Sequence, residues 1–153
     1  MQWTTTTIEE FEQVVKEVLQ IITTSYQATP MDQACIVCLQ GDLGAGKTTA
    51  TQIIARVLGV ENTIQSPTFV IRKSYQTQNA VFKTLIHMDA YRLEGEENLE
   101  VLRLEEDFKS SHTLMIIEWP EIIESIIPEN AIHVTIQHDN GGRIITLDNK
   151  KTA

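Results

Sequence analysis

Hydrophobic residues near the start of the chain recur at three- and four-residue steps, which is the spacing of one helix face. The apolar positions in this stretch are Ile8, Phe11, Val15, Val18 and Ile22. Thr7, followed by Glu10 at the third helical position, forms a capping box, which satisfies backbone N–H groups at a helix start. The pattern predicts an amphipathic helix that begins after Thr7.

Two continuous apolar runs, Ala34–Leu39 and Thr113–Ile117, have the composition of strands that are covered on both faces of a sheet. A glycine-rich turn follows the first run. A helix is predicted from about Lys47 to Gly59, because glycine commonly ends helices. This part of the chain therefore predicts strand, loop and helix in that order.

Two further strands are predicted over Thr68–Tyr75 and Val81–Met88 from their β-branched and aromatic residues, with a hairpin connection at Gln78-Asn79. A short helix is predicted over Glu96–Leu104. Near the end of the chain, apolar and polar residues alternate on both sides of Asn140-Gly141-Gly142, which is typical of a hairpin. Strands interspersed with helices indicate an α/β fold.

The composition narrows the class of protein. The chain has 153 residues, of which 42% are hydrophobic and 22% charged, so we expect one globular domain over residues 1–153. No segment approaches the roughly 18 uncharged apolar residues that a membrane span requires. The formal net charge of -9 repels phosphate backbones, which argues against a protein that binds nucleic acid by itself.

The first residues lack both a basic and a continuous apolar segment, and Glu9, Glu10 and Glu12 fall where a signal peptide would be apolar. A cytoplasmic location is therefore expected. The two cysteines, Cys35 and Cys38, lie on opposite faces of a predicted strand. We expect buried thiols there, and neither a disulfide nor a metal pair.

The glycine-rich turn matches the phosphate-binding loop G-x-x-x-x-G-K-[ST] at every fixed position. It reads Gly41-Asp42-Leu43-Gly44-Ala45-Gly46-Lys47-Thr48 and lies between a predicted strand and a predicted helix. Its glycines let backbone N–H groups face a phosphate, and the helix N-terminus adds a partial positive charge. We expect Lys47 to reach the β- and γ-phosphates and the Thr48 hydroxyl to bind Mg²⁺.

Carboxylates at the ends of neighbouring strands would complete such a site. Glu118 is the candidate second ligand of Mg²⁺, because these loops use an acid at the end of an adjacent strand. Trp119 either packs over the site or fills the rim of the core. His87 and Asp89 share one strand face, and Asp89 could orient the attacking water or hold a metal-bound water. Arg92 could meet a phosphate or pair with a nearby glutamate.

A further segment, Ser66-Pro67-Thr68-Phe69, follows the helix predicted after the phosphate loop. Pro67 favours an extended Ser66 at the start of a predicted strand. Its position resembles a switch segment, in which a threonine contacts Mg²⁺ and the γ-phosphate. Thr68 is the candidate for that contact, and an ordinary entry from loop to strand is the alternative.

Together these segments resemble one family, the small ATPase subunit of bacterial tRNA threonylcarbamoyladenosine biosynthesis, called TsaE or YjeE. Nearly the whole chain is covered, and the segments that carry the resemblance are Gly41–Thr49, Ser66–Phe69, His87–Leu93 and Ile117–Pro120. The resemblance implies a P-loop NTPase-like fold, a three-layer sandwich with a mostly parallel central sheet and antiparallel hairpins. It also implies hydrolysis of ATP with Mg²⁺.

The resemblance further implies partners and residue roles. TsaB-like and TsaD-like subunits would transfer threonylcarbamoyl to adenosine-37 of tRNA, while this ATPase resets the complex and meets tRNA only through it. Thr48 and Glu118 carry over as Mg²⁺ ligands, Thr68 as the switch residue and Asp89 as part of the hydrolytic site. The residues implied at the nucleotide are Gly41, Asp42, Leu43, Gly44, Ala45, Gly46, Lys47, Thr48, Thr49 and Arg143.

Three other interpretations remain. A small P-loop metabolite kinase normally has several arginines in a lid, whereas the arginines here are scattered along the sequence. A GTPase would carry the guanine-binding signature N-K-x-D, but Asn149-Lys150-Lys151 is followed by Thr152. A structural protein with a relic loop would bind ATP without hydrolysing it.

Overall fold

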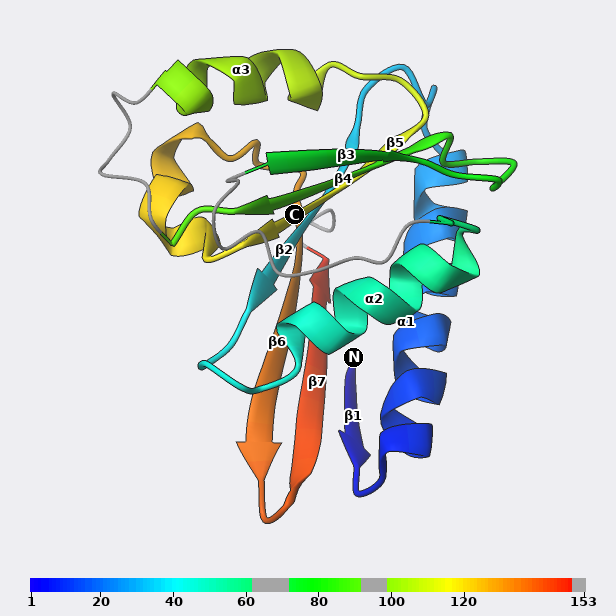
Figure 1. The fold of residues 1–153 in the computed structure, drawn as a ribbon, viewed down its shortest axis with the longest axis vertical. Coiled ribbons are helices and arrows are strands. Elements are labelled where there is room, and N and C mark those ends of the chain that lie inside the picture. The colour runs from blue at the N-terminus through cyan, green and yellow to red at the C-terminus, as the bar shows by residue number, and fades with distance from the viewer. Residues whose placement is uncertain (62–71, 92–98, 150–153) are drawn as a thin grey trace.

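The computed structural model describes residues 1–61, 72–91 and 99–149 (Figure 1). The elements follow one another in the order β1 (Gln2–Thr5), α1 (Ile8–Gln27), β2 (Cys35–Gln40), α2 (Lys47–Val57), β3 (Arg72–Gln76), β4 (Thr84–Asp89), α3 (Leu99–Phe108), β5 (Thr113–Glu118), η1 (Pro120–Ile126), β6 (Ile132–Asp139) and β7 (Gly142–Asn149). The element η1 is a 3-10 helix. Helices and strands alternate along most of the chain, as in an α/β fold.

The strands within the described residues form one sheet in the order β1-β7-β6-β2-β5-β4-β3. Its centre is parallel, because β2 pairs with β6 on one side and with β5 on the other, and β5 pairs with β4. Both edges are antiparallel, with β3 against β4 and the β6–β7 hairpin against β1. The predicted sheet, parallel in the middle with antiparallel hairpins, is confirmed.

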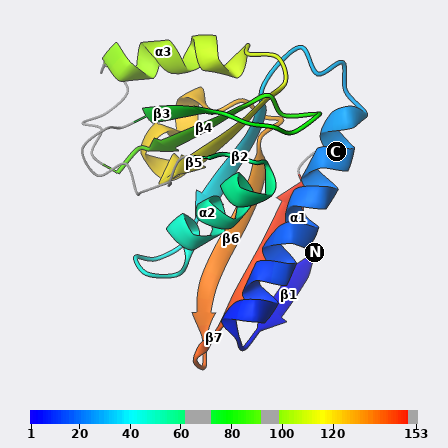
Figure 2. The same ribbon diagram turned by 45° about the vertical axis from the view of Figure 1, so that its right-hand side comes forward.

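Helices cover both faces of the sheet, so the fold has three layers (Figures 1 and 2). The helices α1 and α2 lie on one face, where Phe11 and Cys35 belong to the larger hydrophobic core. The elements α3 and η1 cover the other face, where Leu104 and Cys38 belong to a second core. The two cysteines are buried on opposite faces, as predicted. All residues of β5 are buried, because this central strand contributes to both cores.

The first helix begins where the capping box predicts. The Thr7 hydroxyl accepts a hydrogen bond from the Glu10 N–H at 3.1 Å, and the Glu10 carboxylate accepts one from the Thr6 N–H at 2.8 Å. Of the predicted apolar face, Phe11, Val15, Val18 and Ile22 pack into the core, whereas Ile8 in the first turn is exposed. The helix continues to Gln27. Its last turn is held by Tyr26, whose ring stacks on a buried phenylalanine of the β3–β4 connection. Local sequence therefore sets the start of α1, and tertiary packing extends its end.

Two predicted boundaries differ from the structure by more than two residues. The strand β4 begins at Thr84 and not at Val81. The helix α3 ends at Phe108 and not at Leu104, because both side chains are buried in the second core. The intervening Asp107 is also held in place, since its carboxylate accepts two hydrogen bonds from the Arg72 guanidinium of β3, at 2.6 and 2.8 Å. The predicted start at Glu96 lies outside the described residues.

The β3–β4 hairpin turns at the predicted place. The Asn79 side-chain oxygen accepts hydrogen bonds from the N–H groups of Val81 and Phe82, both at 2.9 Å. An asparagine that binds the backbone ahead of it is typical of a turn. The predicted beginning of the first hairpin strand, at Thr68, lies outside the described residues.

Two elements were not predicted. The strand β1 is four residues long and pairs with β7, at the far end of the chain, so no local pattern marks it. The 3-10 helix η1 begins at Pro120 directly after β5 and buries Ile123 completely in the second core. Both elements depend on contacts with distant residues.

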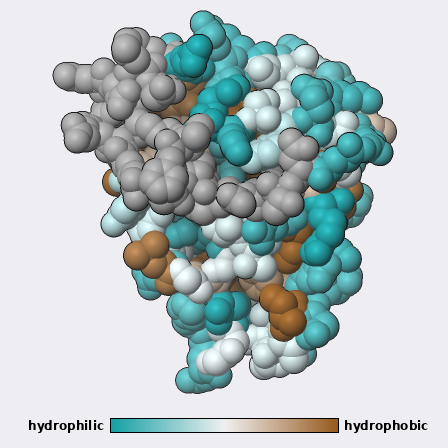
Figure 3. Space-filling model, in the orientation of Figure 1, coloured by the Kyte–Doolittle hydropathy of each residue, from teal (hydrophilic) through white to brown (hydrophobic). Residues whose placement is uncertain are grey.

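The surface of the described residues carries both hydrophobic and hydrophilic side chains. On the face shown in Figure 3, exposed apolar side chains form separate patches between hydrophilic ones. The large hydrophobic residues that are exposed belong to different elements and are Met1, Ile8, Leu43, Val57, Tyr91 and Ile122. Among the described residues there is no helix long and apolar enough to cross a membrane.

Replacing Thr7 tests the capping box. Thr7→Ala should lower the free energy of unfolding by about 1 kcal/mol, because the Glu10 N–H loses its acceptor. Thr7→Ser keeps a hydroxyl and should stay within about 0.5 kcal/mol of the wild type. Urea denaturation without nucleotide measures both variants. An alanine variant as stable as the wild type would mean that the cap does not stabilise α1.

Candidate functional site

The phosphate loop joins the end of β2 to the start of α2, as predicted. Gly41 and Gly46 have φ angles of 153° and 117°, which residues with a side chain rarely adopt. Space is also restricted at both positions. A Cβ on Gly41 would lie 2.3 Å from the Ile136 carbonyl oxygen, and one on Gly46 would lie 3.2 Å from Phe11 Cζ. These two glycines are therefore required by both the backbone conformation and the packing.

The N-terminus of α2 is open to an anion. Gly46 is the N-cap residue and has no side chain that could accept from the first turn. The first helical hydrogen bond runs from the Ala50 N–H to the Gly46 carbonyl at 2.8 Å. The N–H groups before Ala50 lack helical partners, as at every helix start. Such a helix N-terminus, preceded by a glycine-rich loop, is a common phosphate-binding arrangement.

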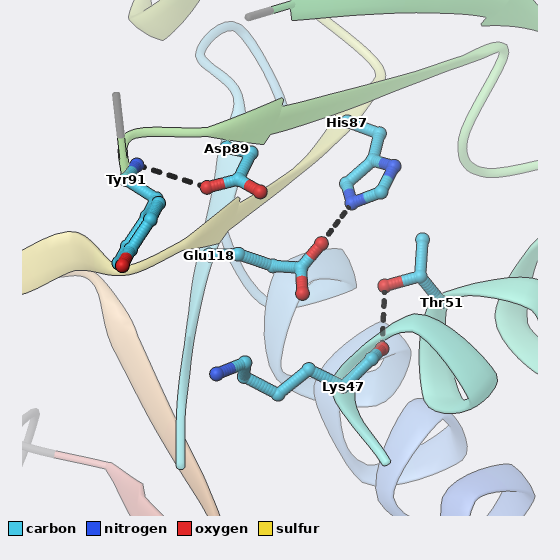
Figure 4. Close-up of polar contacts among 6 residues, drawn as sticks. All are labelled: Lys47, Thr51, His87, Asp89, Tyr91 and Glu118. Atoms are coloured by element: carbon cyan, nitrogen blue, oxygen red, sulfur yellow. Dashed lines mark hydrogen bonds and ion pairs between the residues drawn. The ribbon is translucent and has the colours of Figure 1, made fainter. Parts of the chain in front are cut away.

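Lys47 is almost completely buried beside this loop, at 6% exposure. Its ammonium donates a hydrogen bond to the Gly41 carbonyl and lies 4.0 Å from the centroid of the Trp119 ring. The Thr51 hydroxyl donates to the Lys47 carbonyl at 3.0 Å (Figure 4). A carbonyl and an aromatic face thus hold the lysine ammonium at the loop.

Glu118 ends β5 and lies beside Asp89, the last residue of β4, in the parallel register of the two strands. Its side chain is buried, and its Oε2 lies 2.6 Å from Nε2 of the fully buried His87 (Figure 4). With the imidazole proton on Nε2, His87 donates this hydrogen bond to the Glu118 carboxylate. Figure 4 shows the second carboxylate oxygen of Glu118 turned away from His87.

Asp89 lies closer to solvent than Glu118. Its Oδ1 accepts a hydrogen bond from the Tyr91 N–H at 2.9 Å (Figure 4). Burial is the main effect that raises the pKa of the Asp89 carboxyl above its ordinary value. The Tyr91 N–H opposes this rise in pKa, and the negative charge of Glu118 adds to it. Two neighbouring carboxylates of this kind favour a cation between or beside them.

These groups meet in a pocket of about 210 Å³. Its lining residues are Leu43, Gly44, Gly46, Lys47, Thr48, Thr49, Asp89, Glu118 and Trp119. The loop and α2 provide hydrogen-bond donors, and β4 and β5 provide carboxylates. The structure therefore brings together Lys47, Thr48, Asp89 and Glu118, which were predicted as site residues from the sequence. Their chemical roles stay predictions.

Trp119 closes one side of this pocket. Its backbone is left-handed, with a φ of 57°, which is unusual for a residue other than glycine. Its ring lies over the Lys47 ammonium and 5.1 Å from the Tyr91 ring, and it also contacts the second core. Of the two alternatives for this tryptophan, packing over the site and filling the core rim, the structure shows both.

Arg143 approaches the loop from β7. Its Nε donates a hydrogen bond to the Ala45 carbonyl at 2.7 Å, and its Nη1 donates to the Gly142 carbonyl at 2.9 Å. It lines a second pocket, of about 220 Å³, together with Phe11 and residues 5–8. The two pockets share Gly44, Gly46 and Thr49, so they flank the phosphate loop.

Two predicted site residues, Thr68 and Arg92, lie outside the described residues, and their roles stay predictions. Sequence reasoning placed His87 on the strand face of Asp89 but did not pair it with Glu118. The missing information was the register between β4 and β5. The alternation His87-Met88-Asp89 at the end of a buried strand was the signal that could have suggested this contact.

The described part of the chain contains no group of three or more His, Cys, Asp or Glu side chains that could hold a metal ion. Mg²⁺ that binds with a nucleotide does not need one, because it uses one or two carboxylates together with phosphates and waters. Glu118 and the Thr48 hydroxyl, both in the pocket, provide oxygen ligands of the kind that Mg²⁺ prefers.

The loop, its helix and the parallel strands beside it place this protein among the P-loop NTPase-like proteins. A family model described as "Threonylcarbamoyl adenosine biosynthesis protein TsaE" matches residues 5–145. The chain belongs to the TsaE family, which takes part in tRNA threonylcarbamoyladenosine biosynthesis. The family resemblance drawn from the sequence is thereby confirmed.

Curated relatives and a solved structure agree with this assignment. The chain is 36% identical over 116 residues to the tRNA threonylcarbamoyladenosine biosynthesis protein TsaE of Haemophilus influenzae. The matched residues cover 76% of this chain and 71% of that protein. It is 36% identical over 137 residues to the protein of the same name from Bacillus subtilis, and the match covers 90% of this chain and 77% of that protein. The crystal structure of Bacillus subtilis YdiB superimposes with a TM-score of 0.68 at 29% identity, covering 97% and 84% of the two chains.

Asp89→Asn should raise the free energy of unfolding at about pH 7 without nucleotide. The folded state raises the pKa of this carboxyl, so ionised Asp89 costs more in the folded chain than in the unfolded one. Asparagine removes the charge and keeps the acceptor for the Tyr91 N–H. The gain should shrink as the pH falls through the raised pKa toward 3.8, where the wild-type carboxyl is protonated as well.

Urea denaturation at about pH 7 and about pH 4 measures this difference. Asp148→Asn removes an exposed carboxylate of β7 and serves as the matched control, with no change expected. A destabilised Asp89→Asn variant at neutral pH would contradict the electrostatic description of the site.

Proposed function

We propose that this chain binds ATP with Mg²⁺ and hydrolyses it, as the ATPase subunit of the machinery that makes threonylcarbamoyladenosine in tRNA. The observation that carries the proposal is the pocket in which Lys47 and Thr48 face Asp89 and Glu118. Phosphoryl transfer from a nucleoside triphosphate requires groups that donate hydrogen bonds to the phosphates and carboxylates that bind the metal ion or the nucleophile. The two sides of this pocket provide these two kinds of group. Membership of the TsaE family supports the same use of the pocket.

Phosphate binding begins with Lys47. When ATP enters, the ammonium exchanges the Gly41 carbonyl for β- and γ-phosphate oxygens, and the first N–H groups of α2 donate to the phosphates. Because the side chain is already held beside the loop, little conformational entropy is lost in this step. The Thr48 hydroxyl and the Glu118 carboxylate would hold Mg²⁺, which supplies neutralisation of the charge that develops on the phosphate oxygens.

The second pocket is the proposed place for the nucleoside. It adjoins the loop on the side away from Glu118 and is lined by the Phe11 ring, by threonines 5–7 and by Arg143. An aromatic ring with hydroxyl and guanidinium groups around it suits a base and a ribose. The shared residues Gly44, Gly46 and Thr49 would then carry the phosphate chain from one pocket into the other.

Asp89 is assigned the role of orienting the water that attacks ATP. Its Oδ1 is engaged by the Tyr91 N–H, which leaves the other carboxylate oxygen to accept a hydrogen bond from the attacking water. The water oxygen then bonds to the γ-phosphorus as the bond to the β-phosphate oxygen breaks. The products are ADP and phosphate, and the proton that the water loses is released with them. Thr68 is the proposed switch residue that reports the nucleotide state.

The proposed partners are TsaB-like and TsaD-like subunits, which carry out the transfer to adenosine-37 of tRNA. In this scheme ATP hydrolysis resets the complex between turnovers. The partner subunits bind the tRNA, and this chain acts on it only indirectly. The net charge of -9 is consistent with a chain that does not hold tRNA itself. A cytoplasmic location stays a prediction.

A physical argument supports the dependence of the ATP hydrolysis rate on the partner subunits. Phosphoryl transfer is often accelerated by an arginine that contacts the γ-phosphate, worth roughly 10³–10⁵ in rate. The Arg143 guanidinium already donates to the Ala45 and Gly142 carbonyls, so it braces the loop. Arg92, the other internal candidate, lies outside the described residues. With Arg143 engaged at the loop, we assign slow turnover to the chain alone and faster turnover to the assembled complex.

Lys47→Ala tests phosphate binding in the pocket that Lys47, Asp89 and Glu118 line, here called the phosphate pocket. Loss of a charged donor to phosphate should weaken ATP binding by about 10- to 100-fold, which corresponds to about 1.5–3 kcal/mol. Isothermal titration calorimetry with ATP measures the affinity. Lys83→Ala, at an exposed position of the β3–β4 connection, is the control and should bind ATP as the wild type does. Unchanged affinity in Lys47→Ala would refute the assignment of the loop.

The partner subunits with tRNA should raise the kcat of ATP hydrolysis by at least about tenfold, some 1.4 kcal/mol of activation free energy. Thr68→Ala should abolish this gain. Steady-state ATPase assays of the chain alone and of the reconstituted complex measure both effects. Full turnover by the isolated chain, unaffected by partners or tRNA, would instead favour a free-standing metabolite kinase.

A further inference from the structure

His87 is a fully buried polar side chain whose position the proposed chemistry does not use directly. It does not line the phosphate pocket, yet its Nε2 lies 2.6 Å from Glu118 Oε2. Its other ring nitrogen, Nδ1, is also buried and has no hydrogen-bond partner among the described residues. The imidazole therefore directs one hydrogen bond, and within the described residues only one, at the carboxylate.

The strand register explains the direction of this contact. Asp89 lies opposite Glu118 in the parallel pairing of β4 and β5, and His87 lies opposite Ile116, two residues earlier on the same face. The hydrogen bond from His87 thus comes from the interior side of Glu118. One carboxylate oxygen is held toward the core, and the other is turned away from the imidazole (Figure 4).

A merely structural histidine is a poor explanation for this arrangement. The strand face around His87 is apolar, with the fully buried Leu85 two residues earlier on β4. Burying an imidazole with one nitrogen unpaired costs free energy that a leucine would not. The contact does, however, restrict the rotamer of Glu118, as hydrogen bonds to metal ligands commonly do.

We propose that His87 is a positioning residue for Glu118, holding one carboxylate oxygen so that the other is presented to Mg²⁺ at the phosphate loop. The inference rests on the proposed function and adds a determinant of metal affinity to it. Contacts of this kind typically change metal affinity by about 10- to 100-fold. His87 does not line the pocket at the loop, so affinity for metal-free ATP should not depend on it.

The test is the gain in ATP affinity that Mg²⁺ produces, measured by calorimetry with Mg²⁺ and with EDTA. His87→Asn ends too short to reach Glu118 and should reduce this gain about tenfold or more, with unchanged affinity in EDTA. His87→Gln can place an amide N–H near the position of Nε2 and should retain most of the gain. If His87→Asn does not fold, His87→Leu fills the volume and removes the donor in its place.

Two further variants separate positioning from packing. Leu85→Val makes a small cavity on the same strand face without touching Glu118, and it should keep the full Mg²⁺ gain. In a Glu118→Gln background, His87→Asn should cause no further loss, because the two residues act through one interaction. Additive losses, an equal loss in Leu85→Val, or a full gain in His87→Asn would each overturn the inference.

The same data judge the proposed function separately. If wild-type ATP affinity responds to Mg²⁺ and Glu118→Gln removes that response, the metal site stands whatever His87 does. If wild-type affinity does not respond to Mg²⁺, the proposed metal site and the inference both fail. If Glu118→Gln keeps the response, the role of Glu118 fails, and with it the role of His87.

Discussion

The parallel pairing of β2, β5 and β4 is the constraint on which the site depends. The carboxyl ends of parallel strands lie at one edge of the sheet, and ligands bind there in open α/β sheets. The loop after β2 and the acids that end β5 and β4 therefore meet although they are far apart in sequence. A slip of one residue in β4 or β5 would turn Asp89 or Glu118 to the opposite face of the sheet.

The packing around the loop holds it in a conformation suited to phosphate. Gly41 passes so close to the Ile136 carbonyl that no side chain fits, and Gly46 rests against the Phe11 ring of α1. The Arg143 guanidinium of β7 donates a hydrogen bond to the Ala45 carbonyl. Elements from both ends of the chain thus fix the loop, which lowers the cost of ordering it when a ligand binds.

The sequence predicts the parts of this protein whose signals are local. The start of α1 follows from Thr7 and Glu10, and the loop follows from its glycines and Lys47, because neighbouring residues define both. The strand β1 was missed because its partner β7 is at the other end of the chain. The contact between His87 and Glu118 was missed for a related reason, since it depends on the register of two strands that a helix separates.

The most direct test of the account is a ¹H–¹⁵N NMR titration of the wild-type chain with ATP and Mg²⁺. The account predicts that the largest changes in amide chemical shift occur at Gly41–Thr49 and at the ends of β4 and β5, and that binding saturates at one ATP per chain. Changes centred instead on the pocket beside Tyr26 and Asn130, at the other ends of the parallel strands, would contradict it.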